Sequence, residues 1–144
     1  QRLKEEENNK DRIEWDAKRF LSKNNYIIQT DAVKNFLIPK KNYRDNLEWL
    51  AYAEEADILN VALFGFTAKA WREANPQLAG KNNVRDFATV NELTVLSNLE
   101  THNAQMIREG KNKNERFRIL KEIAEYQLGI LNAAEQIKID EMKK

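Results

Sequence analysis

The placement of glycine and proline constrains this fold more than any other feature of the chain, which has only four glycines and two prolines. Both residues interrupt helices, so they mark where regular segments end. Five of these six residues lie where helical patterns break, and strong helix formers dominate between them. Apolar and polar residues never alternate over a convincing length, and the one strand-like run, residues 26–28, is too short to build a sheet. The sequence therefore predicts an all-α fold of about five to six helices in an irregular bundle.

The first helix is predicted over residues 3–23, and its two halves differ in character. Residues 4–12 are wholly polar. The later half carries apolar residues on one face at helical spacing, and we expect this face to pack against the domain: Ile13, Ala17, Phe20 and Leu21. We therefore expect residues 1–23 to form a projecting linker helix and residues 24–144 to form a single helical domain.

Three shorter segments are predicted to follow. Thr30 has the character of an N-cap, because its hydroxyl can accept a hydrogen bond from a free amide of the next helix, which Pro39 would end. A third helix is expected over residues 43–64. Thr67 is then expected to cap a fourth, short helix over residues 68–74.

The carboxy-terminal third predicts a long antiparallel helical hairpin. Thr89 and Glu92 have the spacing of a capping box at the start of a helix over residues 90–109. Asn112 and Glu115 repeat that spacing before a last helix that reaches about residue 142. Because the intervening connection is short, the two helices are expected to lie side by side in opposite directions.

Gly129 lies inside the last predicted helix, where glycine costs about 1 kcal/mol relative to alanine. Either a neighbouring helix approaches closely at this position or the helix kinks there. Close packing is the interpretation we adopt.

Composition excludes several classes of protein. There is no cysteine, so disulfides, thiolate metal sites and thiol nucleophiles are excluded, and a reducing compartment is compatible. No apolar run approaches the roughly 20 residues that cross a bilayer. We therefore expect a cytoplasmic protein without membrane contact. The chain begins with Gln1 inside a charged helical pattern, which indicates a fragment of something longer.

The residues needed for catalysis are not gathered in any recognised pattern. His102 is the one histidine, and Glu100 points to a different side of its helix, so the paired spacing of a strong metal motif is missing. The acidic run at residues 54–57 is interpreted as a solvated strip, because acid–base catalysis needs carboxylates held across a cleft. We expect no enzyme activity, no metal and no cofactor.

Two groups of polar residues are candidate functional sites. The first consists of polar and aromatic residues near apolar stripes: Asp57, Asn60, Trp71, Arg72, Arg85, Asp86 and Asn98. Buried polar groups must be paired, so this group is interpreted as a structural network in which Arg72 or Arg85 pairs with Asp57 or Asp86. A recognition pocket is the alternative. The second group lies in a basic stretch that could contact nucleic acid: Lys111, Lys113, Arg116, Arg118 and Lys121.

The central residues resemble a known family. Residues 56–65, residues 67–76 with Trp71-Arg72 and Asn75-Pro76, and residues 83–86 and 96–100 are similar to the C-terminal region of bacterial and phage KilA-N domain proteins, which are associated with mobile elements. The resemblance spans nearly the whole chain, but it excludes the KilA-N module itself, which lies upstream in that family. It implies a parent protein that binds DNA through that module. It supplies no catalytic residue for this region.

Three functional hypotheses follow. The first is a non-catalytic module that forms a homo-oligomer, or engages a protein partner, for the DNA-binding parent. The second is an auxiliary nucleic-acid-binding domain that uses residues 111–121, which would bind duplex DNA in a salt-sensitive way because neutralised phosphates release counterions. The third is a small-molecule sensor or effector around Trp71, Arg85 and Asp86, which requires a concave pocket.

Overall fold

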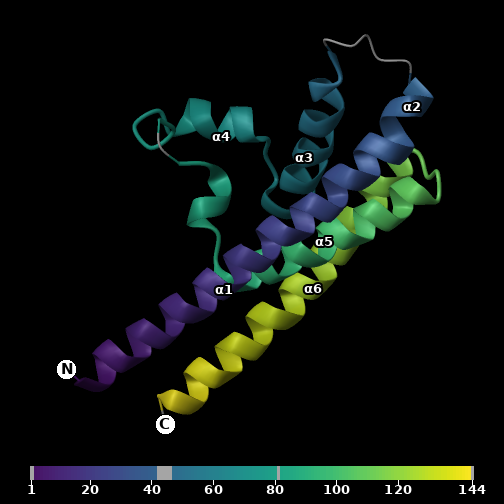
Figure 1. Ribbon diagram of the computed structural model, residues 1–144. Coiled ribbons are helices and arrows are strands. Elements are labelled where there is room, and N and C mark those ends of the chain that lie inside the picture. The colour runs from purple at the N-terminus through teal and green to yellow at the C-terminus, as the bar shows by residue number, and fades with distance from the viewer. Residues whose placement is uncertain (1, 42–46, 81, 144) are drawn as a thin grey trace.

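The computed structural model describes residues 2–41, 47–80 and 82–143, and every regular element in these ranges is helical. The longest helices are α1 (Arg2–Ala32), α5 (Val90–Arg108) and α6 (Lys113–Met142). Two shorter α-helices, α3 (Trp49–Phe64) and α4 (Ala68–Ala74), and a 3-10 turn, η3 (Val84–Phe87), lie between them in the chain. Figure 1 shows the long helices stacked side by side, with α4 and η3 to one side. The predicted all-α class is confirmed.

The first helix is much longer than predicted. It passes Lys23 without a break, continues into a π-helical turn, η1 (Val33–Leu37), and then into α2 (Ile38–Lys41). The N-cap prediction for Thr30 is wrong, because its hydroxyl lies within the helix and donates to the Ile27 carbonyl at 2.9 Å. The proposed boundary at residue 23 therefore falls inside a continuous helix.

Pro39 also does not end the helix where predicted. Proline lacks an N–H and its ring clashes with the carbonyl four residues earlier, which normally breaks an α-helix. Here the wider π-turn precedes it directly, and the Ile38 amide donates to Val33 five residues back. The π-turn changes the hydrogen-bond register just before the proline, so the chain continues as a helix to Lys41.

The local signals around α3 and α4 are mostly confirmed. The predicted start of the third helix, Tyr43, lies outside the described residues, and α3 begins at Trp49. It ends at Gly65, which adopts a left-handed φ of 86° that glycine tolerates without steric cost. The Thr67 hydroxyl caps α4 by accepting a hydrogen bond from the Ala70 amide at 3.1 Å.

The C-terminal hairpin is confirmed. The Thr89 hydroxyl accepts from the Glu92 amide at 3.1 Å, and the Glu92 carboxylate accepts from the Thr89 amide at 2.8 Å, which completes the predicted capping box. Asn112 caps α6 by accepting from the Glu115 amide at 2.8 Å. The turn between the helices contains Gly110 with a left-handed φ of 81°.

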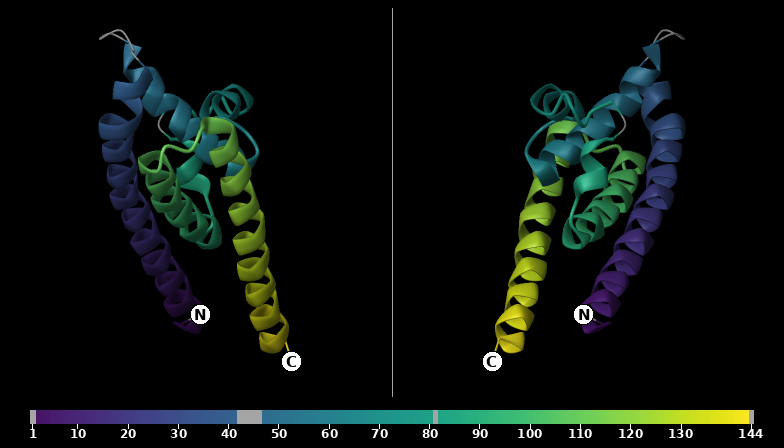
Figure 2. Two further views of the ribbon diagram at one scale, coloured as in Figure 1. Left: turned by 90° about the vertical axis from the view of Figure 1, so that its right-hand side faces the viewer. Right: turned by 90° about the vertical axis from the view of Figure 1, so that its left-hand side faces the viewer.

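α5 is the central helix of the fold. Figure 2 shows α1 and α6 on either side of it, with their outer ends extending past it toward the same end of the molecule. One apolar cluster fills the space between α3, α5 and α6, and its fully buried members are five leucines and one valine: Leu59, Leu93, Val95, Leu96, Leu99 and Leu120. A second cluster joins η1, α3 and α5 around Val33, Ala51, Ala104 and Ile107.

Gly129 offers a direct test of helix propensity. The predicted close approach at this position is wrong, because a Cβ added there would meet no atom within 4 Å among the described residues. We therefore expect Gly129→Ala to raise the free energy of unfolding by about 0.5–1 kcal/mol, since alanine has the higher helix propensity. Urea denaturation measures the change. The reverse substitution at an exposed position of the same helix, Ala133→Gly, should lower stability by a similar amount. A destabilised Gly129→Ala variant would contradict the explanation.

Candidate functional site

The two faces of α1 are inverted relative to the prediction. The apolar residues expected to pack instead face solvent, and the side chains of Ile13, Phe20 and Leu21 are 65%, 68% and 44% exposed. Ile27, further along the helix, is 64% exposed. We name the exposed apolar residues of this helix the outer stripe: Ile13, Ala17, Phe20, Leu21, Ile27 and Ile28. Three of them recur every seven residues, the period of helix-to-helix contacts. The predicted inward orientation of this face is therefore wrong.

The inner face of α1 is largely polar and is held by hydrogen bonds instead. The Trp15 indole donates to the Ala88 carbonyl at 2.8 Å, and the Asn25 amide donates to the Ser97 carbonyl at 3.0 Å. The buried Ser22 hydroxyl donates to Glu100 at 2.9 Å. Because these polar groups find partners on α5 and the adjoining loop, the helix packs with its apolar stripe outward.

α6 carries a second exposed apolar stripe. Tyr126, Ile130 and Ile137 are all exposed, and Ile130 and Ile137 lie seven residues apart. Ile123, seven residues before Ile130, is partly buried against the core cluster. Both long outer helices thus present apolar residues to solvent. Contiguous exposed apolar residues of this kind mark interaction surfaces on folded proteins.

A buried ion pair lies at the centre of the fold. The Arg116 and Glu55 side chains are each 1% exposed and form a bidentate pair, in which Arg116 Nη2 donates to Glu55 Oε2 at 3.0 Å and Nη1 donates to Oε1. Asn103 accepts from Arg116 at 2.8 Å and donates to Glu55 at 2.9 Å and to Gln29 at 3.1 Å. The pair is thus fully hydrogen-bonded and joins α1, α3, α5 and α6.

This pair corrects two predictions. Glu55 was placed in a solvated acidic strip, but it lies on the buried side of α3 at the spacing of Ala51, Ile58 and Leu59. Arg116 was a candidate nucleic-acid contact, but a side chain that is 1% exposed and paired with a carboxylate cannot reach a phosphate backbone.

The other basic residues of the 111–121 stretch remain at the surface, where acidic neighbours partly neutralise them. Lys111 lies 3.9 Å from Glu109, and Lys113 lies 3.5 Å from Glu54. Arg118 pairs with Glu122 at 3.8 Å, and Lys121 is exposed. The stretch therefore does not form a continuous basic face, and its contact with nucleic acid stays a prediction.

The residues predicted to form one polar group, between positions 57 and 98, lie in separate parts of the structure. Asp57 lines a shallow hollow beside Phe117, and Arg72 is exposed on α4. The Trp71 ring packs against Phe87 with centroids 5.8 Å apart. Asn98 is on the solvent side of α5 and donates to Gln127 at 2.9 Å. None of the predicted arginine–aspartate pairs forms among the described residues.

Three members of that group do come together, with different partners. Arg85 Nε donates to Asn60 Oδ1 at 3.4 Å, and Arg85 Nη1 lies 3.9 Å from Glu100. Asp86 lies 3.6 Å from Arg19 and also caps η3 by accepting from the Asn83 amide at 2.9 Å. The arginine pairs with a glutamate from α5, and the aspartate with an arginine from α1.

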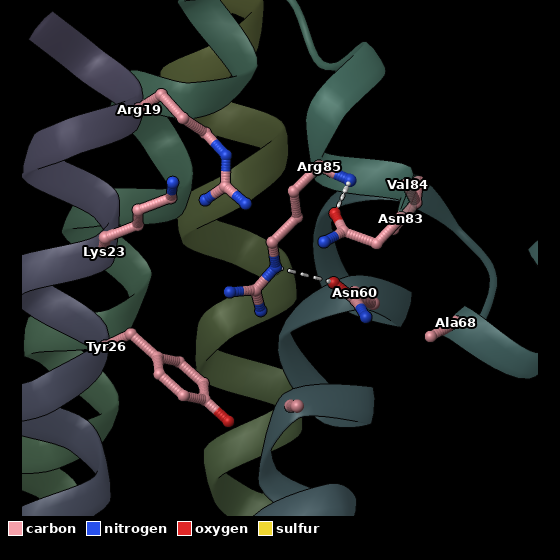
Figure 3. A pocket seen from close by; sticks show the side chains of 9 residues that line it. Arg19, Lys23, Tyr26, Asn60, Ala68, Asn83, Val84 and Arg85 are labelled. Carbon is pink, nitrogen blue, oxygen red and sulfur yellow. Dashed lines mark hydrogen bonds between the residues drawn. The ribbon is translucent and has the colours of Figure 1, made fainter. Parts of the chain in front are cut away.

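These residues border a cavity of about 350 Å³ between α1, α3 and η3. Figure 3 shows Arg19, Lys23 and Tyr26 reaching into it from α1, with Asn60 and Arg85 on the opposite side. The Arg85 guanidinium also lies 5.5 Å from the centre of the Tyr26 ring. Of the three residues in the sensor hypothesis, Arg85 lines this cavity, whereas Trp71 and Asp86 do not.

Burial shifts the pKa values of two groups beside this cavity, Glu100 and Arg85. Desolvation raises the pKa of the Glu100 carboxyl to about 7, and the nearby Arg85 charge and the Ser22 hydrogen bond only partly oppose that rise. Desolvation also lowers the pKa of Arg85, and attraction to Glu100 opposes the change. The Glu100 carboxyl therefore titrates near neutral pH.

The α1 contribution to this site was missed at the sequence level. Trp15, Arg19, Ser22, Tyr26 and Gln29 follow one another at intervals of three or four residues, which places them on one helical face. That face contains few aliphatic residues, so its pattern is weaker than that of the outer stripe. The regular spacing of its aromatic and polar residues was the available signal.

No protein-family profile, curated protein or solved structure was found to match this chain. Within residues 2–41, 47–80 and 82–143, no helix combines the length and apolar character that crossing a bilayer demands. In the same ranges, no three or more histidine or carboxylate residues are grouped so that they could hold a metal ion.

Proposed function

We propose that this domain is a non-catalytic assembly module that pairs with a second copy of itself through the outer stripe of α1. The observation that carries the proposal is the outward orientation of Ile13, Phe20 and Ile27, each more than 60% exposed. Water contact with such side chains is unfavourable, and their burial against a partner is the usual way to remove it.

Magnitudes support a stable self-association. Burying one large apolar side chain fully contributes about 1.5–3 kcal/mol. A symmetric interface would cover Ile13, Phe20 and Ile27 of both copies, since a two-fold axis brings the same patch of each molecule together. The free energy gained by burying these side chains is similar in size to the cost of association, which is about 4–15 kcal/mol for lost translational and rotational freedom. Because only the surplus over that cost appears as affinity, stable pairing also requires the burial of Leu21 and Ile28, the other large exposed residues of the outer stripe.

The choice of a second copy rests on the spacing. The seven-residue recurrence of Ile13, Phe20 and Ile27 is the repeat by which one long helix packs along another. In a two-fold pair the outer stripe of one copy packs along the outer stripe of the other, so one chain supplies both sides of the contact.

In the cellular context we propose, the domain belongs to a longer cytoplasmic protein that binds DNA through an upstream KilA-N module. The support is the sequence resemblance of residues 56–100 described above. A two-fold assembly suits such a protein, because paired DNA-binding modules contact two half-sites at once and gain affinity from it.

The outer stripe gives a direct test. We expect the double variant Phe20→Glu and Ile27→Glu to be a monomer where the native chain is a dimer, because the added carboxylates would be desolvated in the interface. Sedimentation equilibrium measures both species. Leu78→Glu, at an exposed apolar position outside α1, is the matched control and should stay dimeric. A native chain that is monomeric at tens of micromolar would overturn the proposal.

A further inference from the structure

The cavity between α1, α3 and η3 has a one-sided charge. Three cationic side chains line it, namely Arg19, Lys23 and Arg85, and none of the described residues in its wall carries a carboxylate. Asn60 and Asn83 add side-chain amides to the wall, and Tyr26 adds a phenol. Figure 3 shows the charged and polar ends of these side chains gathered around one space. Like charges held together in this way repel one another unless an anion joins them.

Two acidic residues pair with two of these cations at ion-pair distances, but without direct hydrogen bonds. Arg19 lies 3.6 Å from Asp86 and Arg85 lies 3.9 Å from Glu100, distances too long for hydrogen bonds. Buried Arg19 Nε, Arg85 Nη2 and Glu100 Oε2 have no hydrogen-bond partner among the described residues. Since an unmet buried polar group is costly, a further acceptor in the cavity would satisfy the two arginine donors.

We propose that this cavity binds the phosphate group of a small phosphate-bearing molecule, with Arg19, Lys23 and Arg85 as its charged ligands. The site is separate from the outer stripe and does not depend on the self-association proposed above. Arg19 and Lys23 belong to α1 and Arg85 to η3, so a bound phosphate would join these two elements.

Charge and size favour a phosphate ester over simpler anions. Two guanidinium groups present planar sets of N–H donors that match phosphate oxygens, and a phosphate monoester carries about −1.5 to −2 charges at neutral pH. A monovalent carboxylate would balance less of the positive charge. The cavity volume of about 350 Å³ lies within the range of roughly 300–1,000 Å³ typical of small-molecule sites. Space therefore remains for an organic group beyond the phosphate.

The test is a titration followed by two-dimensional NMR at constant ionic strength, with chloride replaced by the probe. Inorganic phosphate and glycerol 3-phosphate are the two probes, and they distinguish free phosphate from an ester as the source. We expect saturable shifts of the Tyr26, Asn60 and Arg85 signals with both. At least threefold tighter binding of the ester would identify an organic phosphate as the ligand, and equal binding would identify free phosphate.

Substitutions distinguish specific binding in the cavity from non-specific electrostatic attraction of phosphate to the protein surface. Lys23→Ala is the main variant, because Lys23 is exposed and its loss should leave the fold intact. We expect it to weaken phosphate binding at least fivefold, and Arg19→Gln to weaken it further. Lys10→Ala removes the same charge from an exposed position of α1 that does not line the cavity, and should bind as the native chain does. Unsaturable shifts, or equal weakening by Lys10→Ala and Lys23→Ala, would overturn the proposal.

Discussion

Arg116→Ala is expected to lower the free energy of unfolding by about 3–5 kcal/mol, which is a large part of the stability of a domain this size. The substitution leaves the buried Glu55 carboxylate without its bidentate partner and Asn103 without a donor. An unpaired charge in the core is far more costly than an unpaired charge at the surface, because water cannot solvate it. Urea denaturation followed by circular dichroism measures the loss.

Two controls isolate the buried pair. Arg118→Ala removes the same side chain two residues away, where it is 64% exposed and pairs only with Glu122, and it should change stability by less than about 0.5 kcal/mol. The double variant Glu55→Leu and Arg116→Met replaces both charges with apolar groups. It should recover much of the loss, because no charge is then left unpaired. Equal effects of Arg116→Ala and Arg118→Ala would contradict this account.

Glu100 is expected to make stability depend on pH near neutrality. Burial raises the pKa of its carboxyl from 4.5 to about 7 in the folded chain. Between these two values the folded chain keeps the proton that the unfolded chain releases, so stability falls as pH rises. The contribution is fully present below about pH 4.5, is lost as pH rises through about 7, and is absent above it.

The variant Glu100→Gln removes this titration and keeps a side-chain oxygen that can accept from Ser22. Its stability relative to the native chain should therefore increase by roughly 2 kcal/mol between about pH 5 and pH 8. Urea denaturation of both proteins across that interval measures the difference. The exposed Glu122→Gln serves as the matched control and should show a constant difference. A constant difference for Glu100→Gln as well would show that this carboxyl does not control the pH response.

The helix caps and stops were predictable because each depends on groups close together in the chain. The Thr67 hydroxyl accepts from an amide three residues later. Across the same interval, the side chains of Thr89 and Glu92 each accept from the other residue's backbone amide. Gly65 ends α3 through its own left-handed backbone. The predictions at Thr30 and Pro39 were wrong for the same reason. Capping and proline rules consider only residues close in sequence, and they take no account of the neighbouring helices that stabilise the helical conformation of residues 30–41.

The candidate site was predictable only in part. Asn60, Arg85 and Asp86 were correctly identified as polar residues near apolar stripes, and the structure brings them together. Their charged partners could not be predicted, because Glu100 and Arg19 come from two other helices. Arg72, Asn98 and Asp57 were included on the same reasoning, but they face solvent or another hollow.

The sequence alone therefore determined the helical class, the caps and the C-terminal hairpin, because periodicity and capping act over a few residues. Only the tertiary structure decided which face of α1 lies inside and which carboxylate neutralises Arg116. Ser22 and Glu100 are 78 residues apart in the chain, and Glu55 and Arg116 are 61 apart. Hydrogen bonds between such distant groups stabilise a polar inner face, whose regular spacing does not by itself show that it is buried, and they leave the apolar face of α1 exposed to solvent.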